Sequence, residues 1–282
     1  MSGTPDPALA QRRAAIDEAL GAVPLASETT AVDVTIGGVP VVECNVAGPV
    51  AVVLYLHGGG FRMGSARAWR AYGSHLARIC GARVLVVDYR LAPEHPFPAA
   101  LDDALSVYRA TLRQGVPASS IVVAGDSAGG NLAAALVLAA VAETLPMPAG
   151  VVCCSPWVDL TNTAESYDTR RHVDALFSLQ AANEAAQGYL GDGDRRDPLV
   201  SPVFGDWRGA PPVLIQVGDS EVLLDDASLL AAAIHRAGGQ VTHRVYPGMP
   251  HVWQLAYPAP DAVAAVDEIG AFVRDVTQSG MG

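Results

Sequence analysis

Short apolar runs, each separated from the next by a longer helical segment, constrain the fold of this chain more than any other feature of its sequence. Runs of this kind are typical of strands that helices cover on both faces, as in a parallel sheet. Regular alternation of strand and helix predicts an α/β fold with right-handed crossovers. The predicted strands are Val50–Leu56, Arg83–Val87, Ile121–Ala124, Gly150–Cys154, Pro212–Val217 and Val241–Tyr246.

The segments between these runs have helical patterns that end at residues unsuited to a helix. Gly81 and Gly115 follow two of them, and Pro146 follows a third. Upstream of the first long run, a Gly-Gly pair divides Val32–Cys44 into two short β-rich pieces, which predicts a hairpin. The predicted helices are Ala66–Cys80, Ala99–Gln114, Ala128–Leu145, Asp225–Ala237 and Asp261–Val276.

Two stretches do not follow the alternation, residues 1 to about 30 and about 160 to 206. Both are polar or helical, and glycines and a proline interrupt the second one. Insertions at the ends of a sheet commonly form lids over a site. A chain of 282 residues is short enough to fold around one hydrophobic core. We therefore expect a single domain over residues 1–282, with a small cap contributed by these two stretches.

Composition excludes several classes of protein. Half of the residues are hydrophobic and 17% are charged, which argues against a disordered chain. The formal net charge is −11, and an acidic surface repels phosphate groups, so we expect no nucleic-acid partner. The longest apolar stretch, Leu132–Val141, is half of the ~20 residues that a membrane span needs, so we expect no membrane partner.

The four cysteines indicate neither a disulfide framework nor a zinc site, because they are few and unevenly spaced. Cys153 and Cys154 are adjacent within an apolar run, which predicts buried thiols. The N-terminal residues are polar, and acidic residues at positions 17 and 18 interrupt any apolar segment, so we expect no signal peptide. These observations favour a cytoplasmic protein.

The most informative motif is Gly125-x-Ser127-x-Gly129, which lies directly between a predicted strand and a predicted helix. This context is the one that a nucleophile elbow requires, and the alternative is an ordinary glycine turn. Glycines flank the serine because a Cβ atom would clash there. The N-terminus of the next helix favours the negative charge that develops near the serine. We expect Ser127 to be a nucleophile and the adjacent Asp126 to support the elbow from behind.

A second motif, His57-Gly58-Gly59-Gly60, directly follows the first long apolar run. Glycine lets backbone N–H groups approach a substrate oxygen closely, and preorganised donors of this kind stabilise a tetrahedral oxyanion. The alternatives are a flexible turn or a phosphate loop, but no Gly-Lys-Ser/Thr follows and the spacing does not fit a dinucleotide fingerprint. We expect the N–H groups of Gly58, Gly59, Gly60 and Ala128 to form an oxyanion hole, and His57 to hold the loop.

Three motifs together resemble those of the hormone-sensitive-lipase family of α/β-hydrolases, the bacterial family IV esterases. They are His57–Phe61, the proline-rich segment Asp88–Ala100 and Gly125–Asn131, in the family's order and spacing. The resemblance runs from about residue 45 to the C-terminus. It implies a mostly parallel, eight-stranded sheet flanked by helices, a small helical cap, carboxylesterase activity on short acyl chains, and no metal or other cofactor.

A serine hydrolase also needs a histidine that takes the serine proton, and in this fold the histidine comes last in the chain order serine, acid, histidine. Three histidines, His235, His243 and His251, lie in the C-terminal part. The first falls in a predicted helix and the second in a predicted strand. His251 lies in the loop between the last strand and the last helix, and it matches the family's catalytic histidine. We expect His251 to be the general acid/base.

The carboxylate that orients this histidine is less clearly marked. The family usually presents Asp-Pro-Leu-x-Asp after the preceding strand, whereas this chain has Glu221-Val-Leu-Leu-Asp225. The alignment places Glu221 at the acid position, with Val222 in place of proline. Glutamate also accepts a hydrogen bond from the imidazole. Asp219 is the main alternative, and Asp225 is a second one that we expect to cap the following helix.

Aromatic residues make up only 6% of the chain, and several lie beside the motif loops or in the two cap stretches. Phe61, Trp157 and Trp253 are expected to line a small apolar pocket, although they could equally pack the cap onto the body. We expect a small-molecule substrate, a short uncharged ester. Lactone, carbamate or amide hydrolysis would use the same residues. A non-catalytic receptor is disfavoured because Ser127 and His251 are both present, and a homodimer is compatible with the sequence.

Overall fold

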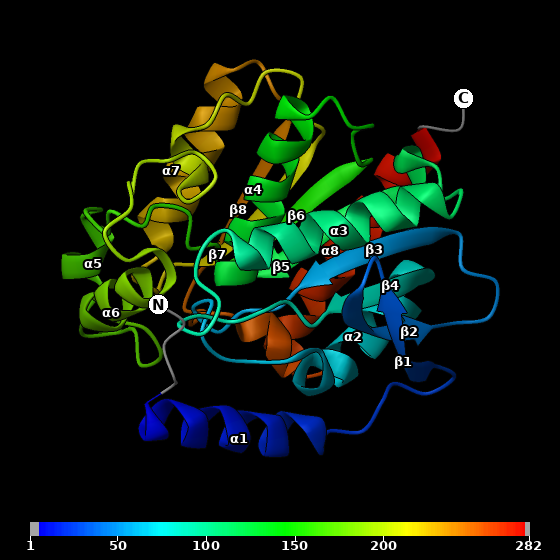
Figure 1. The fold of residues 1–282 in the computed structure, drawn as a ribbon, viewed down its shortest axis with the longest axis horizontal. Coiled ribbons are helices and arrows are strands. Elements are labelled where there is room, and N and C mark those ends of the chain that lie inside the picture. Colours follow the sequence, from blue (N-terminus) through cyan, green and yellow to red (C-terminus); the bar gives the residue numbers. More distant parts are fainter. Residues whose placement is uncertain (1–5, 280–282) are drawn as a thin grey trace.

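The computed structural model describes residues 6–279, which form one eight-stranded sheet covered by helices (Figure 1). The strand order is β1-β2-β4-β3-β5-β6-β7-β8. Strand β2 runs antiparallel to β1 and β4, and every other neighbouring pair is parallel, so the expected mostly parallel sheet is confirmed. The strands are β1 (Thr30–Ile36), β2 (Val39–Asn45), β3 (Ala51–Leu56), β4 (Ala82–Val87), β5 (Ile121–Asp126), β6 (Gly150–Cys154), β7 (Val213–Gly218) and β8 (Val241–Tyr246).

Helices cover both faces of the sheet (Figure 1). Helices α3, α4 and α7 pack on one face, α2 and α8 pack on the other, and α1 lies outside α2. No helix within residues 6–279 is long and apolar enough to cross a bilayer. The helices are α1 (Pro7–Gly21), α2 (Ala66–Cys80), α3 (Ala99–Arg113), α4 (Ala128–Ala142), α5 (Ser166–Thr169), α6 (Leu179–Leu190), α7 (Leu224–Arg236) and α8 (Pro260–Ser279), with short 3₁₀ turns at Ala118–Ser120, Pro202–Phe204 and Trp253–Ala256.

Strand β3 shows why the apolar runs are continuous. Its side chains alternate between the two layers of helices: Val52, Leu54 and Leu56 join the core under α3 and α4, whereas Val53 and Tyr55 join the core under α2 and α8. All five are buried. Because both faces of the strand are covered, every position must be apolar.

Strand β8 departs from this expectation. It pairs with β7 alone and forms one edge of the sheet. All of its side chains are at least partly exposed, and Val245 is 46% exposed. The prediction that this run is buried on both faces is therefore wrong, since an edge strand is covered less completely than a central one.

The four cysteines are unpaired and buried, and the expected burial of Cys153 and Cys154 is confirmed. Cys44 of β2, Cys80 of α2 and Cys154 of β6 lie in the core between the sheet and helices α2 and α8. Cys153 of β6 lies in the core on the opposite face of the sheet. Burial raises the pKa of the Cys44 and Cys80 thiols to about 12. Thiols in such surroundings are inert at neutral pH.

The loops that follow β3, β5, β6, β7 and β8 meet at the carboxyl edge of the sheet, where ligands bind in open α/β folds. Helices α5 and α6 belong to the stretch between β6 and β7 and lie together on one side of the molecule (Figure 1). Helix α1 is tied to the loop after β3, because the Arg13 side chain donates to the Arg62 carbonyl and pairs with Glu94. Residues 1–5 of the expected cap lie outside the described residues, and the division into body and cap stays a prediction.

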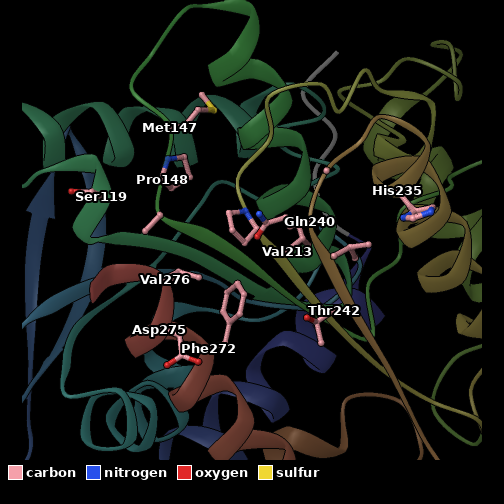
Figure 2. A pocket seen from close by; sticks show the side chains of 14 residues that line it. Ser119, Met147, Pro148, Val213, His235, Gln240, Thr242, Phe272, Asp275 and Val276 are labelled. Atoms are coloured by element: carbon pink, nitrogen blue, oxygen red, sulfur yellow. The ribbon is translucent and has the colours of Figure 1, made fainter. Parts of the chain in front are cut away.

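A cavity of about 880 Å³ lies at the amino ends of β6, β7 and β8, the edge opposite the loops described above (Figure 2). Val213 and Val241 begin two of these strands and line it. Phe272 of α8 points into the opening from one side, and Met147 lies on the other side (Figure 2). The cavity is therefore separated from Ser127 by the length of the strands.

Candidate active site

Ser127 lies on a turn that the sequence around it makes sterically necessary. Its backbone has φ 53° and ψ −119°, a conformation that side-chain-bearing residues rarely adopt, and it directly precedes α4. A Cβ atom on Gly125 would lie 2.2 Å from the Gly129 carbonyl oxygen, and one on Gly129 would lie 1.9 Å from the Leu56 carbonyl oxygen. The expectation that only glycine fits on both sides of the serine is confirmed.

Three side chains that are far apart in the sequence form one hydrogen-bonded chain. The Ser127 hydroxyl lies 3.0 Å from His251 Nε2, and His251 Nδ1 lies 2.7 Å from Glu221 Oε2. Because a carboxylate only accepts, Nδ1 carries the imidazole proton and Nε2 is left to accept from the serine. Ser127 follows β5, Glu221 follows β7 and His251 follows β8, so the carboxyl ends of three strands in the same half of the sheet hold all three.

The Glu221 carboxylate is fully buried, and its second oxygen is also held. Oε1 accepts hydrogen bonds from the Gly218 N–H (2.6 Å) and from the Ser155 hydroxyl (2.8 Å). The Ser155 hydroxyl in turn accepts from the N–H of Val252, next to His251 (3.1 Å). Sequence reasoning missed Ser155. The signal that could have found it is its place directly after β6, at the same edge of the sheet.

The two alternative acids point elsewhere. Asp219 accepts from the Gly248 N–H (2.7 Å) in the turn before His251, and Asp225 accepts from the Ser166 N–H (2.8 Å) of α5. Neither is hydrogen-bonded to the imidazole. The expectation that Asp225 caps the helix is wrong, because α7 begins at Leu224 and places Asp225 inside its first turn.

Burial and charge act on His251 in opposite directions. Burial lowers the pKa of the imidazole, whereas the hydrogen bond and negative charge of Glu221, with the charges of Asp174 and Asp126, raise it. The net result is a pKa above the ordinary 6.5. A positively charged imidazolium is therefore stabilised at this position.

The glycine loop offers fewer free donors than the sequence predicted. The Gly58 N–H donates to Asp126 Oδ1 (3.0 Å) and is not free to bind a substrate oxygen. Within the described residues, no acceptor is bonded to the N–H of Gly59, Gly60 or Ala128. These three groups are the remaining candidates for an oxyanion hole, and Gly58 is better described as part of the loop's anchor.

Asp126 fixes this loop from beneath. Besides Gly58, its Oδ1 accepts from the Tyr55 hydroxyl (2.8 Å) and from Trp69 Nε1 (3.0 Å). Burial raises the pKa of Asp126 to about 6, although these hydrogen bonds oppose the rise. His57 has the structural role that was expected, since its Nδ1–H donates to the Gly58 carbonyl (2.8 Å) and its ring stacks on Tyr89.

The predicted pocket aromatics separate into two groups. Phe61 and Trp157 are in contact, with ring centroids 5.6 Å apart, and Trp157 also meets Phe177 of the cap stretch. The Phe177 ring in turn stacks on His251 at 5.7 Å. Trp253 packs instead against Tyr246 and helix α8. It does not share the aromatic cluster of Phe61 and Trp157, because its 3₁₀ turn directs it toward α8.

The site has no arrangement suited to a metal. Within residues 6–279, no group of three or more His, Cys, Asp and Glu side chains is placed to hold a metal ion. The chemistry that the arrangement offers is nucleophilic: a hydroxyl, a base that is hydrogen-bonded to it, a carboxylate that orients the base, and unpaired N–H donors nearby.

Comparison with known proteins gives consistent matches. A family profile described as alpha/beta hydrolase fold matches residues 53–255. An acetyl-hydrolase of Streptomyces hygroscopicus is 44% identical over 81% of this chain and 77% of its own, and an esterase of Acinetobacter venetianus is 39% identical over 82% and 77%. A crystal structure of an esterase from the bacterial hormone-sensitive lipase family superposes with a TM-score of 0.93 at 40% identity, over 98% of this chain and 94% of that one.

Proposed function

Because the chain belongs to the hormone-sensitive-lipase family of α/β-hydrolases and is a carboxylic ester hydrolase, we propose that Ser127, His251 and Glu221 carry out this reaction on short, uncharged esters. The observation that carries the proposal is the continuous hydrogen-bonded chain from the Ser127 hydroxyl to the buried Glu221 carboxylate.

The first half of the reaction forms an acyl-enzyme. Ser127 Oγ attacks the ester carbonyl carbon while His251 Nε2 takes the hydroxyl proton, and Glu221 stabilises the resulting imidazolium. The carbonyl oxygen becomes an oxyanion that the N–H groups of Gly59, Gly60 and Ala128 stabilise. When the tetrahedral intermediate collapses, the bond to the alcohol oxygen breaks and His251 returns the proton to the leaving alcohol.

The second half repeats these steps with water. His251 takes a proton from water as its oxygen attacks the acyl carbon, and the second tetrahedral intermediate releases the Ser127 oxygen. The proton returns to Ser127, and the products are one carboxylic acid and one alcohol. No cofactor takes part in any step.

Large side chains around the site support the proposal that the substrate has a small acyl group. Phe61 and Trp157 are fully buried, and the Phe177 ring lies against His251, so side chains occupy the space beside the triad. The names of several relatives indicate small acyl groups. They include the acetyl-hydrolase described above and an ethyl acetate hydrolase of Pseudomonas putida that is 35% identical over 71% of this chain and 65% of its own.

Active-site labelling tests the proposed nucleophile. A fluorophosphonate probe should label the wild-type protein stoichiometrically, and Ser127→Ala should abolish both the labelling and ester turnover without loss of fold by circular dichroism. A folded wild-type protein that neither reacts with the probe nor turns over esters would contradict the proposal.

The rates of hydrolysis of p-nitrophenyl acetate, butyrate, octanoate and palmitate test the substrate class. A steady rise in rate toward palmitate would exclude a short-acyl pocket.

We further propose a cytoplasmic protein without nucleic-acid partners, which forms a homodimer. Four buried, unpaired cysteines suit a reducing compartment, and the −11 charge disfavours phosphate backbones. The unpaired outer edge of β8 offers backbone groups to a second copy. Light scattering at several protein concentrations gives the oligomeric state, and a monomer at all of them would contradict the dimer.

A further inference from the structure

Val222, the residue after Glu221, has both of its backbone polar groups bonded to side chains of the cap stretch. Its N–H donates to Asp174 Oδ2 (2.9 Å), and its carbonyl accepts from the Ser166 hydroxyl (2.6 Å). Val222 itself is fully buried. The loop that carries the carboxylate partner of His251 is therefore held by residues from a segment about fifty residues earlier in the chain.

Asp174 also organises the part of the cap that reaches the imidazole. Its other oxygen, Oδ1, accepts from the N–H groups of Leu176 and Phe177, both at 2.9 Å. The Phe177 ring stacks on His251, with ring planes 18° apart. One carboxylate thus connects the backbone beside Glu221 with the aromatic side chain that lies on His251.

The identity of residue 222 makes this connection possible. The motif of the family has proline after the acid, and proline has no N–H to donate. Valine at this position supplies the donor that Asp174 accepts. The departure at residues 221 and 222, glutamate with valine in place of aspartate with proline, therefore coincides with an additional bond between the cap and the acid loop.

We propose that Asp174 is a positioning residue that orients the Glu221–His251 pair from the cap, through the Val222 N–H on one side and through Phe177 on the other. The proposal rests on the proposed function, because it concerns the geometry of the same triad. Asp174 touches neither Ser127 nor the imidazole by a hydrogen bond, so its effect on the reaction is indirect.

The charge of Asp174 gives the proposal a second readout. The charged groups that act on His251 are Glu221, Asp174 and Asp126, and each raises the pKa of the imidazole. Removing one negative charge should lower that pKa, so the acid limb of the pH–rate profile should move to lower pH. A carboxylate too far from His251 to act on the imidazole would not move this limb.

Two variants test the hydrogen bond between the Val222 N–H and Asp174, one from the acceptor and one from the donor. Asp174→Asn replaces one accepting oxygen by an amide group that donates, and it removes the charge. Val222→Pro removes the N–H that Asp174 accepts, and it also replaces the buried valine side chain and fixes φ at about −65°, the change that restores the residue usual in the family. We expect each to lower kcat on p-nitrophenyl acetate by about tenfold, with a smaller change in KM, because misorientation of a catalytic group acts mainly on the chemical step. Asp174→Asn should also shift the acid limb to lower pH.

The double variant tests whether the two residues act through one contact. If they do, Asp174→Asn with Val222→Pro should lower kcat by much less than the product of the single effects. Asp168→Asn is the matched control, because this carboxylate lies in the same cap stretch but pairs with Arg171 at the surface. The control should keep kcat within about twofold of wild type and leave the acid limb unchanged.

Three results would overturn the proposal: wild-type kcat and an unmoved acid limb in Asp174→Asn, a fully multiplicative double variant, or a loss of thermal stability in Asp174→Asn with no change in the pH profile. If Val222→Pro does not fold, Asp174→Asn and its control decide the matter alone. An active wild type with an unaffected Asp174→Asn rejects only this inference, whereas a wild type without esterase activity or probe labelling rejects the proposed function.

Discussion

Among single residues, substitution of Glu221 should lower the rate of ester hydrolysis the most, after substitution of Ser127 or His251. Its carboxylate is fully buried and bonded to the imidazole, so Glu221→Ala leaves the imidazolium without its partner. We expect kcat on p-nitrophenyl acetate to fall by about 10³- to 10⁴-fold. Asp219→Ala is the control and should stay within about threefold of wild type, because the Asp219 carboxylate accepts from the Gly248 N–H and the Ser220 hydroxyl and not from the imidazole. The reverse order of the two variants would assign the acid to Asp219.

The protonation state of His251 should determine how esterase activity depends on pH. The proposed base must be neutral to accept the Ser127 proton, and its pKa is raised above 6.5. Activity should therefore be complete at pH values well above that pKa and fall as the pH decreases through it. Initial rates of kcat/KM on a neutral ester between about pH 5 and 9 provide the test. A profile without an acid limb in this range would exclude histidine as the base.

Residues with a local motif could be predicted, and residues defined by distant contacts could not. Ser127 lies in a strand–turn–helix motif, and His251 was selected by its loop and chain order. Nothing near Asp174 in the sequence indicates a role, and the place of Ser155 after a strand does not reveal its partner, because Val222 and Glu221 lie 48 and 66 residues away. The Gly58 expectation failed for the same reason: its N–H is taken by a carboxylate 68 residues away.

At the scale of elements, the junction of β3, β5 and α4 depends on the absence of side chains. Gly129→Ala would place a Cβ atom 1.9 Å from the Leu56 carbonyl oxygen, so the strand and helix must separate. We expect a loss of about 3 kcal/mol in the free energy of unfolding, measured with a denaturant. Gly81→Ala is the control: it has φ 61° and open space around it, so only backbone strain of about 1 kcal/mol is expected.

A Gly129→Ala variant as stable as Gly81→Ala would show that the elbow is more plastic than its close contacts indicate. The elements themselves were predictable where burial is two-sided, since β3 to β7 are mostly apolar runs in which Arg83 and Gln216 are the internal exceptions. The exposure of each strand and the exact residues at which the helices and strands end could not be predicted from the sequence. Strand β8 is partly exposed because it is an edge, and α4 ends at Ala142, before the predicted Leu145, where Thr144 takes a positive φ of 57°.

For the whole molecule, net charge is the property most relevant to substrate choice. With a formal charge of −11, the protein should repel an anionic ester more than a neutral ester of the same size. We expect a lower kcat/KM for the anionic ester at low salt, and a smaller difference in kcat/KM between the two esters at about 0.15 M salt, where charges are screened within about 8 Å. Preference for the anionic ester at low salt would contradict this expectation.

The burial of all four cysteines has a practical consequence for observing the cap. Because the native thiols are inaccessible and those with raised pKa values are almost entirely protonated at neutral pH, a maleimide dye should find no reactive group on the folded protein. A single cysteine introduced at Leu176, which is 65% exposed and adjoins Phe177, would then be the one labelled position. Fluorescence from that dye would follow the segment above His251 during turnover, without any change to the natural cysteines.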